Sequence, residues 1–117
     1  MTFSEHLVDR VRAQLARIDG VSELRMFGGW CATVDGNIAV GVMDNDLIVR
    51  VGAEAYVRCL ALRGARPFDV TGRVMTGWVF VEHSSLVGDR SLASWVDRGV
   101  VFAQTLPPKY VRTSTRR

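Results

Sequence analysis

The sequence contains two cysteines and two histidines, the side chains best suited to nucleophilic catalysis, proton transfer or metal binding. Cys31 and Cys59 stand in apolar surroundings, form no Cys-x-x-Cys motif and have no histidine at metal-ligand spacing. We therefore expect two buried free thiols in a reducing compartment, without a disulfide or a metal site. His6 falls on a predicted helix surface, whereas His83 follows a predicted strand and is better placed to line a cleft.

The acidic residues are scattered singly along the chain. Asp35, Asp44, Asp46 and Asp89 stand at predicted turns and helix ends, where turn formation and capping account for them. No two carboxylates have a spacing that indicates general acid–base catalysis. The sequence thus predicts no catalytic residue and no cofactor, and we expect a protein that is not an enzyme.

Three arginines adjoin predicted strands: Arg25, Arg50 and Arg73. If Arg25 and Arg50 project to the same side, beside Phe27 and Trp78, they form a small cationic and aromatic patch. Such a patch suits a peptide, an anion or single-stranded nucleic acid. The alternative is that these arginines lie over apolar neighbours or pair with acids.

The paired glycines Gly28 and Gly29 separate two predicted strands. Such a pair forms a bulge or a tight turn, or allows a ligand to approach the backbone closely. We do not expect a phosphate-binding loop, because the sequence has no GxxxxGK motif and no predicted helix follows the glycines. A ligand pocket near Gly28-Gly29 and His83 stays open as an alternative.

The stretch from Arg25 to Val51 predicts an antiparallel meander, with turns at Asp35-Gly36 and at residues 44–46. Strand periodicity places one set of apolar residues on the core face: Trp30, Ala32, Val34, Ile38, Val40, Val42, Leu47, Val49 and Val51. The opposite positions are also more apolar than a solvated sheet face normally is. They are Cys31, Thr33, Ala39, Gly41, Met43, Ile48 and Arg50.

The predicted strand from Met75 to Glu82 repeats this two-sided pattern, with Trp78 and Phe80 on one side. We expect helices to cover one face of the sheet, and a helix, a loop or a second subunit to cover the other. The apolar side chains of Ile48, Trp78 and Phe80 therefore predict a homodimer through the second face.

Three helices are predicted around this sheet. Thr2 and Glu5 have the form of a capping box, and the helix that follows ends at Asp19-Gly20. A short helix covers residues 53–62, and the third begins near Asp89 and stops at Pro107-Pro108. A glycine inside the third helix, Gly99, predicts a close approach of helix to sheet. The fold class is therefore α+β: a mainly antiparallel five-stranded sheet with three helices, in the order helix, four strands, helix, strand, helix.

The length of 117 residues and the hydrophobic content of 48% fit one domain, over residues 1–109, followed by a basic disordered tail over residues 110–117. The excess charge of +3 belongs to the end of the chain, where Lys109, Arg112, Arg116 and Arg117 lie. A nearly neutral body argues against a dedicated nucleic-acid binder. Neither a signal peptide nor a membrane span is present, so we expect a cytoplasmic protein.

Several stretches together resemble the TfoX N-terminal domain family, in its short stand-alone form. They are Arg25-Met26-Phe27-Gly28-Gly29, Asp35-Gly36-Asn37, residues 47–52, 66–79, Trp95-Val96 and residues 106–109. The resemblance covers about residues 3 to 109. It implies helices packed on a mainly antiparallel sheet, as in a secretion-chaperone-like two-layer sandwich. Longer members of the family resemble regulators of natural competence with a second helical domain, and the resemblance implies no catalytic residues.

Our first hypothesis is a small non-enzymatic protein-interaction domain, of the transcription or competence-regulator type, with a protein partner and a homodimeric state. The second is a nucleic-acid-associated regulator that uses the arginine patch and the basic tail, and the third is a small-ligand protein or enzyme. The candidate interaction surface comprises Arg25, Phe27, Gly28, Gly29, Ile48, Arg50, Arg73, Trp78 and Phe80.

Overall fold

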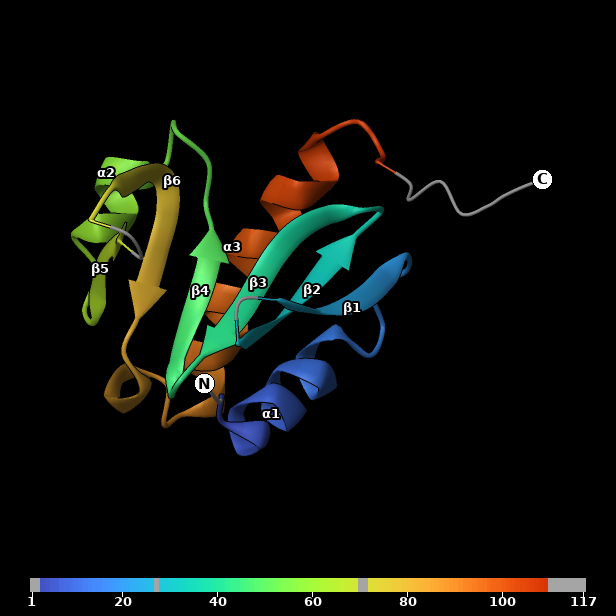
Figure 1. Ribbon diagram of the computed structural model, residues 1–117, viewed down its shortest axis with the longest axis horizontal. Helices are drawn as coiled ribbons and strands as arrows, with labels where there is room; N and C mark the ends of the chain where they lie inside the picture. Colours follow the sequence, from blue (N-terminus) through green and yellow to red (C-terminus); the bar gives the residue numbers. More distant parts are fainter. Residues whose placement is uncertain (1–2, 27, 70–71, 110–117) are drawn as a thin grey trace.

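The computed structural model describes residues 3–26, 28–69 and 72–109 (Figure 1). Its elements follow in the order α1 (Glu5–Leu15), β1 (Val21–Met26), β2 (Gly29–Val34), β3 (Asn37–Met43), β4 (Asp46–Arg50), α2 (Tyr56–Leu60), β5 (Ala65–Asp69), β6 (Val74–Val81), a short 3₁₀ helix (His83–Ser85) and α3 (Asp89–Thr105). Phe27 and the predicted tail 110–117 lie outside the described residues.

The strands form one antiparallel sheet in the order β1-β2-β3-β4-β6-β5. The predicted meander over β1 to β4 is confirmed. The predicted number of strands is wrong, because the sheet has six strands, not five. The additional strand is β5, which contains Pro67. Proline cannot donate to a strand ladder, and it is tolerated here because β5 is an edge strand with a neighbour on one side only.

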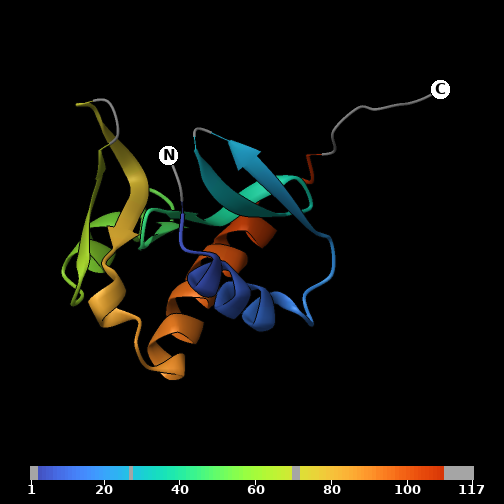
Figure 2. The ribbon, with the colours of Figure 1, turned by 60° about the horizontal axis from the view of Figure 1, so that its bottom comes forward.

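Helices α1 and α3 lie against one face of the sheet (Figure 2). Their apolar faces and the inward side chains of the strands form one core, which includes Val8, Val11, Val40, Val42, Leu47, Val49, Val79, Val81, Leu92 and Val96. The expected close approach at Gly99 is confirmed, because a Cβ atom there would collide with the carbonyl oxygen of Ala39. Because Gly99 has no side chain, α3 can pack close to β3.

The N-cap of α1 is Ser4, whose hydroxyl oxygen accepts a 3.1 Å hydrogen bond from the backbone N–H of Leu7. The predicted capping box of Thr2 and Glu5 is therefore wrong: Glu5 is the first helical residue, and Thr2 lies outside the described residues. A hydroxyl that accepts from the third helical N–H satisfies one of the donors that a helix start leaves unpaired.

The register between β2 and β3 shifts between Ala32 and Thr33, where Ala32 pairs with Val40 but Thr33 pairs with Ile38. This irregularity places an extra residue, Ala39, in β3 and turns Ile38 to the opposite face of the sheet. The predicted core position of Ile38 is therefore wrong. Ala39 is fully buried in the core instead.

The turn between β2 and β3 binds the last described residues of the chain. Asp35 and Gly36 form the predicted turn, with φ of 50° and 86°. The Asp35 carbonyl oxygen accepts a 2.6 Å hydrogen bond from the Lys109 N–H, and the Asn37 side-chain amide donates to the Pro107 carbonyl oxygen at 3.0 Å. Residues 107–109 are thus fixed against the hairpin after α3 has ended.

Among the described residues, no helix is both long enough and apolar enough to cross a membrane.

Candidate functional site

The face of the sheet opposite α1 and α3 carries an apolar groove. Figure 2 shows β1 with β2, and β5 with β6, turning away from these helices on either side of the central strands. The groove between them has a volume of about 270 Å³. It is lined by Gly29, Trp30, Cys31, Ile38, Gly41, Val42, Met43, Ile48, Phe68, Met75 and Trp78.

The floor of the groove is formed by Cys31, Gly41 and Ile48, which lie side by side on β2, β3 and β4. A Cβ atom on Gly41 would lie 2.9 Å from the Trp30 carbonyl oxygen and 3.4 Å from the Cys31 Cβ atom. The floor therefore has no room for a side chain at Gly41, because β2 lies close to β3 at this position. Ile48 is buried, with 8% of its surface exposed, although no helix of the described residues covers this face.

One wall of the groove is an aromatic cluster on β5 and β6. The ring of Phe68 lies 4.9 Å from that of Phe80 and 5.9 Å from that of Trp78, measured between centroids. Met75 stands beside them and exposes 43% of its surface. Methionine adapts its shape to irregular apolar partners. This wall offers rigid rings together with one adaptable side chain.

The two ends of this wall carry different charges. At one end the guanidinium carbon of Arg50 lies 5.1 Å from the Trp78 ring and 5.4 Å from the Phe102 ring. Arg50 forms no ion pair with any acid in the described part of the chain. At the other end Arg66 is neutralised by Asp46, at 2.7 Å. Arg50, which lies over the groove residue Trp78, is therefore held by aromatic rings and has no acidic partner within the described residues.

The predicted surface residues are only partly brought together. Ile48 pairs with Phe80, and Arg50 pairs with Trp78, so these four share the groove face. Arg73 is exposed just before β6, and Gly28 lies in the turn that precedes the groove residue Gly29. Phe27 lies outside the described residues.

Arg25 is on the other side of the sheet. It pairs with Trp30, which pairs with Val42, which pairs with Leu47 in the core. Because paired residues in a sheet point to the same face, Arg25 belongs to the helix-covered side, where its guanidinium carbon lies 5.1 Å from the Phe3 ring. A patch made by Arg25 and Arg50 together is therefore not formed.

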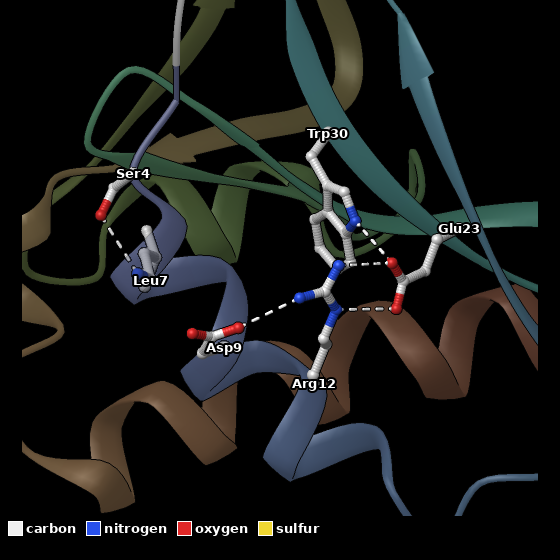
Figure 3. Close-up of polar contacts among 6 residues, drawn as sticks. All are labelled: Ser4, Leu7, Asp9, Arg12, Glu23 and Trp30. Carbon is white, nitrogen blue, oxygen red and sulfur yellow. Dashed lines mark hydrogen bonds and ion pairs between the residues drawn. The ribbon is translucent and has the colours of Figure 1, made fainter.

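The helix-covered side holds a polar cluster that sequence reasoning missed (Figure 3). The Arg12 guanidinium donates to both carboxylate oxygens of Glu23, at 2.8 and 2.9 Å, and the Trp30 indole N–H donates to one of them at 3.0 Å. The hydrogen bond from Arg12, followed by that from Trp30, lowers the pKa of Glu23, and the same ion pair raises the pKa of Arg12. The cluster joins α1 to β1 and β2.

The TfoX N-terminal domain family model matches residues 13–103, most of the chain. The chain belongs to the TfoX N-terminal domain family. No curated protein and no solved structure matches it. The likeness of this TfoX N-terminal domain to secretion chaperones thus stays a prediction.

The reactive side chains of this TfoX N-terminal domain are not gathered at one place. Burial raises the pKa of the Cys31 thiol in the groove floor, which keeps it protonated and weakly nucleophilic. Cys59 is buried next to α3, with its sulfur 3.9 Å from the Arg98 guanidinium. His6 and His83 border a separate hollow of about 350 Å³, away from Gly29. Within the described residues, no three His, Cys, Asp or Glu side chains are grouped as metal ligands.

Proposed function

We propose that this TfoX N-terminal domain is a non-enzymatic, regulatory protein-interaction module of the cytoplasm, and that the apolar groove is its docking surface. The observation that carries the proposal is the unequal covering of the sheet: α1 and α3 pack on one face, and the other face holds a groove with an apolar lining. Hollows lined by apolar side chains are typical of binding sites. Membership in the family supports the regulatory role.

The shape of the groove favours a narrow partner over a second copy of the same face. A two-fold interface requires a surface that is complementary to itself, and a concave groove is not. An amphipathic helix fits better, because it presents apolar side chains along one stripe and docks in apolar grooves. We assign the groove to a partner helix that also carries an acidic side chain toward Arg50, whose charge has no acidic partner among the described residues.

The experiment compares three variants with the wild type in co-purification at native expression, followed by binding measurements with the recovered partner. Met75→Glu places a charge in the groove wall, and Arg50→Glu reverses the charge at its end. Val57→Glu is the matched control, because Val57 exposes 77% of its surface on α2 and does not line the groove.

We expect Met75→Glu and Arg50→Glu each to weaken binding at least about tenfold, and Val57→Glu to leave it unchanged. A partner that binds all three variants like the wild type would contradict the assignment of the groove. Recovery of nucleic acid in place of a protein, lost with Arg50→Glu, would replace the proposal by the nucleic-acid alternative.

A further inference from the structure

The two edges of the sheet differ in how they are protected against further pairing. The edge strand β5 contains Pro67, and its register with β6 shifts between Pro67 and Asp69. Proline and irregular register are devices that keep an edge strand from pairing with another chain. The other edge strand, β1, pairs with β2 over its whole length without a shift, and it contains no proline. Of the two edge strands in the described part of the sheet, β1 is thus the one that is ready to accept another strand.

The backbone groups that β1 offers outward follow from its pairing with β2. The Asp35 N–H donates to the Gly20 carbonyl oxygen at 2.9 Å, at the start of the strand pair. In an antiparallel strand pair, the backbone N–H and C=O groups of one residue hydrogen-bond to the neighbouring strand, and those of the next residue point away from that strand. Ser22 and Leu24 therefore bond to β2, whereas Val21, Glu23 and Arg25 direct their backbone N–H and C=O groups away from the sheet.

The charges on these outward residues favour one register for two copies of β1. In an antiparallel pair about a two-fold axis, only outward residues exchange hydrogen bonds. In a register that places Glu23 opposite Glu23, the two carboxylates repel each other. In a register that places Arg25 opposite Arg25, the two guanidinium groups repel each other. The register between these two places Glu23 opposite Arg25 of the second copy, and this attraction occurs twice because of the symmetry.

The same register brings Leu24 to the two-fold axis, opposite Leu24 of the second copy. Leu24 exposes 43% of its surface and pairs with Cys31, so it lies on the groove face of the sheet. Pairing at the axis would bury it against its copy. We propose that the protein forms a two-fold dimer through antiparallel pairing of β1 with β1, with Glu23 opposite Arg25 and Leu24 opposite Leu24.

This dimer goes beyond the proposed function and does not depend on it. The helix-covered side of the new strand pair holds Glu23 between Arg12 of its own chain and Arg25 of the second copy. The grooves of the two copies lie on the same side of one continuous sheet, because opposed residues in a strand pair share a face. The dimer interface is therefore the β1 edge of the sheet, and the grooves of both copies stay accessible to a partner.

Disulfide cross-linking tests the register directly. Leu24 of the two copies would form a non-hydrogen-bonded pair, with Cβ atoms about 4.5–5.5 Å apart, close to the Cβ separation of about 3.5–4.5 Å in disulfides. In a Cys31→Ala background, which removes the thiol that lies opposite Leu24 within the same chain, Leu24→Cys is therefore expected to give a covalent dimer under mild oxidation. Ser22→Cys is the matched control, since the two Ser22 positions would lie about 13 Å apart along the strands. No covalent dimer with Leu24→Cys, or equal cross-linking at both positions, would overturn the register.

Charge reversal tests the same pairing without a covalent bond. In sedimentation experiments at increasing protein concentration, we expect the wild type to dimerise. Arg25→Glu alone and Glu23→Arg alone should each dissociate the dimer, because like charges then face each other. An equimolar mixture of the two variants should form a heterodimer, in which every charged pair is attractive again.

Glu23→Arg also loses the contacts of Glu23 to Arg12 and Trp30, so its thermal unfolding is measured beside that of the wild type. If that variant does not fold, Arg25→Glu and the cysteine variants still decide the question. A wild type that stays monomeric up to about 1 mM, or an Arg25→Glu variant that dimerises like the wild type, would overturn the proposal.

Discussion

The guanidinium of Arg12 in α1 donates one hydrogen bond to each carboxylate oxygen of Glu23 in β1. The two residues come from different layers of the molecule, and the Trp30 indole N–H donates to the same carboxylate. A two-point contact between guanidinium and carboxylate fixes direction as well as distance. This contact therefore joins α1 to the edge strand β1 in a defined direction.

The Arg12–Glu23 contact predicts a dependence of stability on pH. The pKa of Glu23 is lower in the folded protein, so the stabilisation is complete above the unfolded pKa of about 4.3. It is lost as the pH falls from there through the folded pKa. Glu23→Gln should lower the melting temperature at pH 7, and its effect should become smaller as the pH falls from about 4.3 to 2. The control is Glu54→Gln, because Glu54 forms no ion pair within the described chain. Equal differences at pH 7 and pH 2 would contradict the prediction.

The close approach at Gly99 predicts that a substitution which normally stabilises a helix destabilises this one. Alanine is favoured over glycine in helices by about 1 kcal/mol. Here the new Cβ atom would collide with the Ala39 carbonyl oxygen, so we expect Gly99→Ala to lower the free energy of unfolding by about 1–3 kcal/mol. Urea unfolding measures this difference. Ser94→Ala, on the exposed side of α3, should be neutral or stabilising, and a stabilised Gly99→Ala would show that α3 lies further from β3.

The hydrogen bond from Asn37 to Pro107 predicts a local effect at the C-terminal part of the described chain. Asn37→Ala removes the donor and should lower the free energy of unfolding by about 1 kcal/mol. The nearby Lys109 N–H, which donates to Asp35, should then exchange its hydrogen with solvent faster. Hydrogen exchange followed by NMR measures this. Unchanged protection of Lys109 would mean that Asn37 does not hold the segment.

The raised pKa of Cys31 predicts a slow reaction with alkylating reagents. Because burial keeps the thiol protonated and inaccessible, Cys31 should react more than about tenfold more slowly in the native protein than in urea. Peptide mass spectrometry separates its rate from that of Cys59. A ligand in the groove should slow Cys31 further and leave Cys59 unchanged. Alkylation of Cys31 at the unfolded rate would show that the groove floor is open.

Features that depend on a few neighbouring residues could be predicted from the sequence. The turn at Asp35 and the one at Asp44 were predicted from residue type, and both residues have positive φ, at 50° and 54°. Gly99 indicated the contact between helix and sheet, because a glycine inside an apolar helix stripe is unfavourable unless a side chain has no room. The turn and helix signals were sufficient for these elements.

Features that depend on distant pairing could not be predicted in this way. Strict alternation of inward and outward side chains predicts the wrong face for Ile38. The extra residue in β3 turns the side chains that precede it to the opposite face of the sheet. The faces of Arg25 and Arg50 depend on register across three hairpins. The contact of Arg12 with Glu23 depends on how α1 packs, and neither residue has a local pattern that indicates it.

The attachment of Lys109 to the β2–β3 turn has a practical consequence for immobilisation. Lys109 borders a hollow shared with Val21, Ser22 and Leu24 of the edge strand. A surface linker or affinity handle attached to the Lys109 side chain would therefore leave from that corner of the sheet and not from the helical layer. Biosensor experiments on self-association should capture the molecule through an engineered side chain on α2, so that the chip does not crowd the strand under study.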